Sequence, residues 1–509
     1  MKMLLVIFCL SVIITPAVKA QNKQAAIDSY FDALIANGQF NGNVLVAEKG
    51  NIIYEHSIGL ADAATGVSNK PSTAFAIASI SKTITATAIL QLAEKGKLTI
   101  SEPVAHYLPG FPYSNITLQH LLSHSSGLPP YNAFFDSLRK GDPTRVFTNA
   151  DLIKGLAANP KPLLYPPGEK GNYDNINFAV LALVIEKVSG MHYEEYIREN
   201  ILKPSGMRNT FPVSISTQLL NTKPSYEFAF PHLQPHLYSD SLVKAADVPY
   251  ITSYWKAYEF SGFGQYISTT NDLLKYARAW NNNLLLTAGM KRLAFTPVKL
   301  NNGQNNAANF GLGWQVYKDS SLGKVIYHNG NATGHSCILI NNISKQQTII
   351  VFDNIHGDNS RQTAFDILKI LNDAPVAPPK KSLARLYGKL LSRHGATLAA
   401  DSLYKLKADT LHYYLSEDEM NVMGYDFFGG VNHPNPYRFA ELRKYDEAIA
   451  TFKLNTVLFP LSWNTWDSYG EALLATGKKE EAIQAYKRSV ELNPGNEGGK
   501  KVLEEIKKQ

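Results

Sequence analysis

The chain has 509 residues, with 50 Lys and Arg against 43 Asp and Glu, which gives a net charge of +7 at pH 7. A hydrophobic fraction of 45% and a charged fraction of 18% are typical of a folded soluble protein, and the length predicts two or more domains. The charge excess is small and contains no long basic runs, so the composition argues against binding to nucleic acid.

The first 20 residues have the features of an export signal. Lys2 precedes an apolar stretch from Met3 to Ile14, Pro16 interrupts it, and small residues around Ala20 suit signal peptidase. We therefore predict a Sec signal peptide over residues 1–20 and a periplasmic or secreted protein without a transmembrane segment after cleavage; an uncleaved anchor is the alternative. Cleavage would leave Cys337 as the single cysteine, and its apolar neighbours predict a buried strand residue.

The next elements are an amphipathic helix near residues 23–37 and a pair of strands. The apolar runs 42–47 and 52–56 flank a tight turn at Lys49-Gly50-Asn51, which predicts a hairpin. Residues 72–78 are expected to be extended and to lead into a helix that ends near Gly96. Apolar residues recur along that helix at its spacing: Ile80, Ile84, Ala88 and Leu92.

Ser79 and Lys82 lie at the start of this predicted helix. Residues three apart share a helix face, so the Lys82 amine can hydrogen-bond the Ser79 hydroxyl and, when neutral, accept its proton. The helix N-terminus adds partial positive charge where an acyl oxyanion would form. Alone, the same spacing also fits a solvated serine and lysine on a surface helix.

Helical patterns continue to about Gly206, and strand patterns return afterwards. The predicted later strands cover residues 313–317, 325–328, 336–340 and 348–352. This order of strands, helices and strands predicts an α+β domain with one antiparallel sheet, which is assembled from both ends of the domain and flanked by helices. A helical subdomain is expected between the two sets of strands.

A Pro-rich linker is expected at residues 373–381, followed by an all-α domain over residues 382–509. This second domain contains an internal repeat, because Ala448, Phe452 and Pro460 recur 34 residues later as Ala482, Tyr486 and Pro494. The pattern resembles a tetratricopeptide repeat and is clearest over residues 429–496. Such repeats bind peptides or partner proteins in a concave groove, so a protein partner is expected for this domain.

Three further motifs follow Ser79-Ile80-Ser81-Lys82 in chain order. They are the stretch from Ile116 to Pro129, the stretch from Pro167 to Asn175, and Tyr327-His328-Asn329-Gly330-Asn331. With these four elements, residues 25–372 resemble the serine beta-lactamase and penicillin-binding protein superfamily, in its class C and esterase-like branch. The resemblance implies a beta-lactamase-like serine hydrolase domain over residues 21–372, with Ser79 as the nucleophile.

The resemblance also implies roles for the other motif residues. Tyr173 would assist proton transfer beside Lys82, whose ammonium should favour the phenolate, and Asn175 would orient Lys82 and contact the substrate. The backbone N–H groups of Ser79 and Asn331 would form an oxyanion hole. Gly330 would let the substrate approach the strand closely.

His328 departs from the family pattern, which has a lysine at this place. A permanent cation there would pair with the carboxylate of a beta-lactam or a peptide terminus, whereas histidine is mostly neutral near pH 7. We therefore expect an ester, a D-amino-acid amide or a peptide as substrate; an ordinary buried strand histidine is the other interpretation of His328. His124 could form a Ser-His pair with Ser79, but the resemblance assigns it to the scaffold.

No cofactor or metal is expected, since Pro231 and Pro235 oppose the helix that would bring His232 and His236 together. These two histidines are expected in a loop. Two other functions stay open: a true beta-lactamase or penicillin-binding D,D-peptidase, and a non-catalytic protein that acts through its repeats. Aromatic residues in loops 131–160 and 213–260 could line a substrate cleft or pack locally, namely Tyr131, Phe134, Tyr238, Tyr250 and Trp255.

Overall fold

The computed structural model describes residues 16–214, 227–248, 258–306, 308–355, 359–429 and 443–508. Most of the predicted signal peptide, together with Tyr250 and Trp255, lies outside these residues. The first helix, α1, spans Pro16–Ala36 and thus begins before the predicted position 23. Among the described residues, no helix is both long and apolar enough to cross a membrane.

The centre of the fold is a six-stranded antiparallel sheet in the order β12-β13-β14-β15-β1-β2. Strands from both ends of the domain meet in it, because β1 pairs with β15 in the register Val44↔Val351. This confirms the predicted α+β architecture. The strand bounds are Gly42–Glu48 for β1, Asn51–Ile58 for β2, Gln315–Val316 for β12, Val325–Ala332 for β13, His335–Asn342 for β14 and Gln347–Asp353 for β15.

Local sequence explains the first hairpin. Lys49 and Gly50 form a two-residue turn, and both have positive φ values, 51° and 78°, as a type I′ turn requires. Glycine adopts such angles without strain, so Gly50 fixes the register in which Glu48 faces Asn51.

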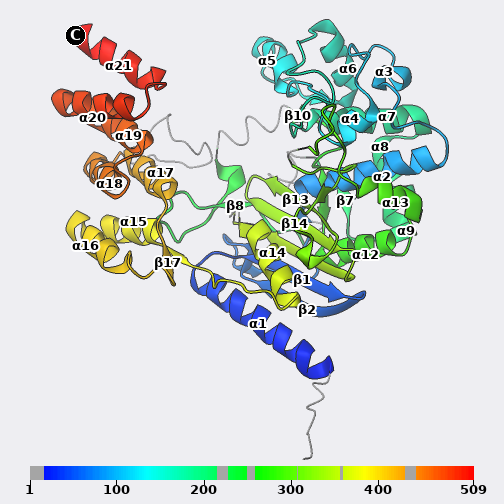
Figure 1. The fold of residues 1–509 in the computed structure, drawn as a ribbon, viewed down its shortest axis with the longest axis horizontal. Helices are drawn as coiled ribbons and strands as arrows, with labels where there is room; N and C mark the ends of the chain where they lie inside the picture. The colour runs from blue at the N-terminus through cyan, green and yellow to red at the C-terminus, as the bar shows by residue number, and fades with distance from the viewer. Residues whose placement is uncertain are drawn as a thin grey trace, which may run out of the picture.

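Alternate side chains of the sheet face two separate cores. Val44, Val46 and Val351 belong to the core beneath α1 and α14 (Asn359–Leu371), whereas Leu45 and Ile350 belong to the larger core on the other face. Figure 1 shows α1 and α14 on one side of the sheet and the helical subdomain with α12 on the other. This alternation follows from the two-residue period of a strand.

The helical subdomain and its connecting strands fill the sequence between β2 and β12. Its first long helix, α2, spans Ser81–Glu94 and is buried on nearly all sides. The other α-helices among its described residues are α3 (Val104–Tyr107), α4 (Leu118–Leu122), α5 (Asn132–Gly141), α6 (Asn149–Ala158), α7 (Ile176–Ser189), α8 (Tyr193–Ile197), α9 (Lys203–Ser205), α12 (Thr270–Asn281) and α13 (Ala288–Ala294). Short strands link them: β3 (Leu60–Asp62), β4 (Val67–Ser68), β5 (Phe75–Ala76), β6 (Phe147–Thr148), β7 (Phe211–Pro212), β8 (His232–Leu233), β9 (Val243–Lys244), β10 (Tyr258–Glu259) and β11 (Tyr266–Ser268).

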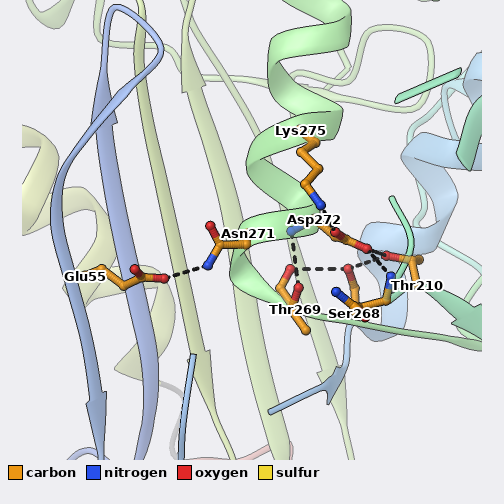
Figure 2. A network of polar contacts seen from close by, with 8 residues as sticks. Glu55, Thr210, Ser268, Thr269, Asn271, Asp272 and Lys275 are labelled. Carbon is orange, nitrogen blue, oxygen red and sulfur yellow. Dashed lines mark hydrogen bonds and ion pairs between the residues drawn. The ribbon is translucent and has the colours of Figure 1, made fainter. Parts of the chain in front are cut away.

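A polar network, buried around Asp272 and exposed at its contact with the sheet, holds the start of α12 (Figure 2). Thr269 caps the helix by accepting a hydrogen bond from the Asp272 backbone N–H, and the buried Asp272 carboxylate accepts one from Thr210 Oγ1 at 3.0 Å. Lys275 Nζ lies 2.7 Å from the same carboxylate, and Asn271 donates to Glu55 on β2. The network therefore ties two separate parts of the chain, at Thr210 and at Glu55, to one helix end.

The C-terminal helical region comprises α15 to α21, which stack into an arm that ends at the C-terminus (Figure 1). Residues 374–380 precede it without helix or strand, and the two-residue strands β16 (Lys381–Ser382) and β17 (Tyr413–Tyr414) pair within it. Its helices are α15 (Leu383–His394), α16 (Ala396–Leu406), α17 (Glu417–Phe428), α18 (Tyr445–Leu458), α19 (Trp463–Ala475), α20 (Lys479–Leu492) and α21 (Glu497–Lys508).

Two of the three repeated residue pairs occupy equivalent buried positions in this arm, whereas Pro460 and Pro494 are exposed. Ala448 and Phe452 are buried on α18, and Ala482 and Tyr486 are buried on α20. Gly470 faces Tyr486 so closely that an added Cβ would lie 2.9 Å from the ring. The 34-residue period thus reflects helix packing.

Candidate active site

A sharp turn presents Ser79 at the junction of β5 and α2. The residue before it, Ala78, has a positive φ of 41°, and residues Ala78–Ile80 form a short 3₁₀ turn, η1. Ala78 and Ile80 are buried, whereas Ser79 is half-buried. A left-handed conformation at a residue with a Cβ costs on the order of 1–3 kcal/mol, and the turn uses it to expose one hydroxyl.

Lys82 lies one helical turn after Ser79 and is fully buried. Its Nζ is 2.9 Å from Ser79 Oγ, 2.8 Å from Asn175 Oδ1 and 3.1 Å from the Phe263 carbonyl oxygen. Burial lowers the pKa of Lys82 well below its usual value, and the nearby Asp174 carboxylate only partly opposes this. A neutral amine has two N–H groups, which can donate hydrogen bonds to the two carbonyl oxygens. Its lone pair can then accept a hydrogen bond from the Ser79 hydroxyl.

Aromatic rings surround the Lys82 amine. The ring centroids of Tyr173, Phe263 and Phe178 lie 4.9, 5.4 and 5.9 Å from Nζ. These rings shield the amine from water, and this exclusion of water is why its uncharged form is favoured.

Tyr173 directs its hydroxyl toward Ser79, and 42% of the residue's surface is exposed. Burial raises the pKa of Tyr173, and a hydrogen bond with Ser79 opposes the rise. The predicted phenolate beside a Lys82 ammonium stays a prediction, and both pKa directions oppose it, because burial favours the protonated phenol and the uncharged amine.

His124 supports the loop that carries Tyr173 and Asn175. Its Nδ1 accepts a hydrogen bond from the Asp174 backbone N–H at 3.2 Å, and its backbone oxygen accepts one from the Asn172 N–H at 2.8 Å. The imidazole packs on Tyr173 with 4.2 Å between ring centroids. His124 is buried in a left-handed conformation with φ 55°, and burial holds its pKa well below the usual range. The structure thus gives this histidine the role of a scaffold for the loop.

His328 faces the site from β13 and is buried. Its Nδ1 donates to the Asn329 carbonyl oxygen at 2.7 Å, and its ring centroid lies 6.2 Å from that of Tyr173. Burial, with a smaller contribution from Lys82, lowers the pKa of His328 to about 3. The imidazole is therefore neutral at physiological pH and cannot serve as a cationic anchor.

Gly330 allows β13 to pack against the turn that carries Ser79. A Cβ added at this position would lie 2.2 Å from the Ile77 carbonyl oxygen and 2.7 Å from Cys337 Sγ. The glycine is thus required by contact between two protein segments, whereas the sequence had suggested contact with substrate. The next residue, Asn331, has an exposed side chain whose Oδ1 accepts from Ser336 Oγ at 3.1 Å.

The structure brings Ser79, Lys82, Tyr173, Asn175 and His328 together. Sequence reasoning missed the Phe263 carbonyl, which is a main-chain group and carries no sequence signal. It also missed Phe178, which lies just past Asn175 on α7.

Several predicted neighbours lie elsewhere. Tyr131 and Phe134 are buried, and Tyr131 packs on other aromatic rings such as Tyr258. His232 belongs to β8, so the loop predicted there is wrong at this residue. Within the described ranges, no three His, Cys, Asp or Glu side chains are grouped to hold a metal.

Comparison with known proteins agrees with this geometry. Residues 27–365 match the family model described as Beta-lactamase, and residues 463–496 match that of the tetratricopeptide repeat. Penicillin-binding protein 4* of Bacillus subtilis is 32% identical over 393 residues, which cover 75% of this chain and 84% of that protein.

Solved structures share the fold. The penicillin-binding protein from Bacillus halodurans superposes with a TM-score of 0.55 at 25% identity and covers 67% of this chain and 98% of its own. EstCE1, described as a hydrolase with promiscuous acyltransferase activity, superposes with a TM-score of 0.55 at 20% identity. The match covers 69% of this chain and 99% of the EstCE1 chain, and it shows a likeness of fold alone. The chain therefore belongs to the beta-lactamase family of serine hydrolases and carries a tetratricopeptide repeat in its C-terminal helical region.

Proposed function

We propose that the protein is an exported hydrolase that forms an acyl-enzyme on Ser79 with an ester, a D-amino-acid amide or a peptide. The observation that carries this proposal is the buried Lys82 amine, whose Nζ lies 2.9 Å from Ser79 Oγ and whose pKa is lowered by burial. A lysine with a lowered pKa accepts a proton from serine more readily near neutral pH than an ordinary lysine does.

Acylation uses groups that the site already holds. Ser79 Oγ attacks the substrate carbonyl carbon while its proton passes to Lys82 Nζ, and the carbonyl oxygen becomes an oxyanion facing the backbone N–H groups of Ser79 and Asn331. The bond to the leaving group then breaks. Tyr173 passes a proton to that group and regains one from Lys82, which restores the neutral amine.

Deacylation repeats the same chemistry with water. Lys82 takes a proton from a water molecule as its oxygen attacks the acyl carbon, and the bond from that carbon to Ser79 Oγ breaks with return of the proton to Ser79. Asn175 keeps the amine in place during both steps, because its Oδ1 accepts from Nζ at 2.8 Å.

The charge of the site supports a substrate that needs no carboxylate anchor. The two basic side chains beside Ser79, Lys82 and His328, are both buried, and burial lowers the pKa of each and so favours its neutral form. A penicillin or a peptide with a free C-terminus would leave its carboxylate without a partner at His328, and an uncharged ester or amide would not.

A penicillin-binding or beta-lactam-hydrolysing enzyme is the second candidate, favoured by the 32% identity to a protein named penicillin-binding protein 4*. A third candidate, a non-catalytic protein acting through its repeats, is favoured only by the repeat match at residues 463–496. The intact contact between Lys82 and Ser79 favours the hydrolase over this third function.

Labelling and turnover distinguish these functions. Purified protein is treated with a fluorophosphonate probe and with a fluorescent penicillin, and is then assayed with a p-nitrophenyl ester and a chromogenic cephalosporin, beside Ser79→Ala. We expect fluorophosphonate labelling and ester turnover that both depend on Ser79. Rapid cephalosporin turnover would overturn the substrate proposal, and absence of all Ser79-dependent reactions would overturn the enzyme proposal. If the missing cation is decisive, His328→Lys will gain penicillin labelling.

A further inference from the structure

Residues 227–248, which we call the strap, touch two distant parts of the molecule. The strap contains β8 and β9, which pair with each other as His232↔Lys244 and leave residues 234–242 as a projecting tip. In the view of Figure 1, β8 lies between the sheet and the C-terminal helical region. The tip and the remainder of the strap, residues 227–233 and 243–248, which we call its base, make separate sets of contacts.

The base of the strap is bonded to the segment that leads to Ser79. Ala74, five residues before Ser79, donates its N–H to the Glu227 carbonyl at 2.7 Å and accepts from the Ala229 N–H at 2.9 Å. Phe228 packs with Ala74 in one small hydrophobic cluster. A displacement of this base would therefore be transmitted directly to β5 and the Ser79 turn.

The same base also packs on the turn that follows Asn331. A Cβ added to Gly334 in this turn would lie 2.5 Å from Pro231 Cβ, so the two backbones are in close contact. The next residue, His335, accepts a hydrogen bond from the Ala76 N–H at 3.3 Å, and its ring lies 5.6 Å from that of Phe228. The strap base thus contacts both backbone segments whose N–H groups would form the oxyanion hole.

The tip of the strap is inserted among α15 and α17. Leu237 is buried in the hydrophobic core of the helical region, and its backbone N–H donates to the buried Asp426 carboxylate at 2.5 Å. Tyr238 stacks on Phe427 with 4.6 Å between ring centroids and 3° between ring planes. A Cβ on Gly388 would lie 3.0 Å from Tyr238 Cβ, so α15 approaches the tip as closely as a glycine allows.

Polar contacts complete the seat of the tip. Asp240 pairs with Lys389 and lies 3.7 Å from Arg393, and Gln234 Oε1 accepts from Arg385 Nη1 at 2.7 Å. All three basic residues belong to α15, and the tip supplies the acceptors. The face formed by α15 and α17 is therefore matched to this segment of the same chain in shape and in charge.

We propose that α15 and α17 form a docking surface for the strap tip, and that this contact holds the two halves of the oxyanion site at their working separation. The proposal rests on the acyl-enzyme function proposed above. In this arrangement the N-terminal part of the helical region is a positioning element of the hydrolase. The matched tetratricopeptide repeat, α19 and α20, lies farther along the arm.

The double variant L237A/Y238A of the full chain tests this proposal, with Y404A as its control. Tyr404 is an aromatic residue of α16 with 40% of its surface exposed, and it lies outside the docking surface. Hydrogen–deuterium exchange is measured for residues 234–242, 74–79 and 331–336, and p-nitrophenyl ester kinetics are measured in parallel.

In the double variant, we expect exchange to accelerate by about tenfold in all three segments. We also expect kcat to fall by about tenfold with KM changed less than about twofold, because oxyanion contacts act mainly in the transition state. Y404A should change none of these quantities. The milder surface variant D240K should shift the exchange rates and kcat in the same direction, and D240K/K389D should restore both. These two charge variants replace L237A/Y238A if that variant fails to fold.

The proposal would be overturned if exchange became faster in residues 234–242 while exchange at residues 74–79 and 331–336 and the value of kcat stayed unchanged. Unchanged exchange in the tip itself would overturn it as well, because Leu237 and Tyr238 would then not anchor the tip. If the protein without substitutions has no esterase activity, the acyl-enzyme proposal fails, and the exchange data still decide whether the strap couples the helical region to the site.

Discussion

Replacing Gly330 with alanine tests the packing of β13 against the Ser79 turn. The added Cβ would lie 2.2 Å from the Ile77 carbonyl oxygen, and real Cβ atoms essentially never make contacts under 3.0 Å. The strand and the turn must therefore separate by about 0.8 Å, the difference between these two distances. A misplacement of about 1 Å in an active site costs on the order of 10²-fold in rate. Overpacking at such a site destabilises a protein by about 1–3 kcal/mol.

We therefore expect Gly330→Ala to lower kcat/KM for a p-nitrophenyl ester about 100-fold and the free energy of unfolding by about 1–3 kcal/mol, measured by urea denaturation. Gly141→Ala is the matched control, because a Cβ there meets no atom within 4 Å. Adding Cys337→Ala should restore little, since the Ile77 carbonyl is backbone and cannot be removed. Full activity and stability in Gly330→Ala would refute the claim that close packing at Gly330 sets the site geometry.

Three other predictions concern Lys82, His124 and Asp272. Because burial lowers the pKa of Lys82 and the reactive form is neutral, the rate of fluorophosphonate labelling should fall only as the pH drops through that lowered pKa, and it should be level above it; Lys82→Arg should reduce the rate by about 10³-fold at every pH from 6 to 9. A labelling rate that still rises steadily up to pH 9, as for a lysine with its ordinary pKa, or a rate retained in Lys82→Arg, would contradict the assignment. His124→Ala should lower kcat for the ester more than about tenfold. His124→Asn should keep most of the wild-type kcat, because asparagine accepts a hydrogen bond and tolerates a left-handed φ. Equal losses of kcat in the two variants would contradict the scaffold role. Asp272→Ala should lower the free energy of unfolding, measured in urea, by about 3 kcal/mol, because it leaves buried donors unpaired and Lys275 without its partner. A loss below about 1 kcal/mol would show that the network in Figure 2 contributes little to stability.

The sequence was sufficient to predict the fold class because its signals are local. The hairpin turn at Lys49-Gly50 and the apolar runs of β13 to β15 predicted the strands, and their order predicted a sheet made from both ends of the domain. The register could not be predicted in the same way. Every residue of β14 and β15 is buried, so these strands lack the alternation that fixes pairing.

The candidate site was predictable to different depths. Ser79 and Lys82 are three residues apart on one helix, so their contact follows from helix geometry alone. Tyr173, Asn175 and His328 were found only through the family resemblance, because no local rule brings such distant residues together. The lowered pKa of Lys82 depends on burial by aromatic rings from two separate segments, residues 173–178 and Phe263, and a sequence does not reveal burial of this kind.

Tyr238 shows a further limit of sequence reasoning. Its loop suggested either a substrate cleft or local packing, whereas the structure places its ring against Phe427 of the C-terminal helical region. Contacts between distant helical and catalytic segments depend on tertiary arrangement, and neither composition nor periodicity indicates them.

The most direct test of the central claim, that Ser79 is a nucleophile activated by Lys82, is mass spectrometry of the protein quenched during turnover of a slow p-nitrophenyl ester. We predict an added mass equal to the acyl group on the peptide that contains Ser79, and no added mass in Ser79→Ala or Lys82→Arg. An acyl group on any other residue, or ester turnover that persists in Ser79→Ala, would contradict the account.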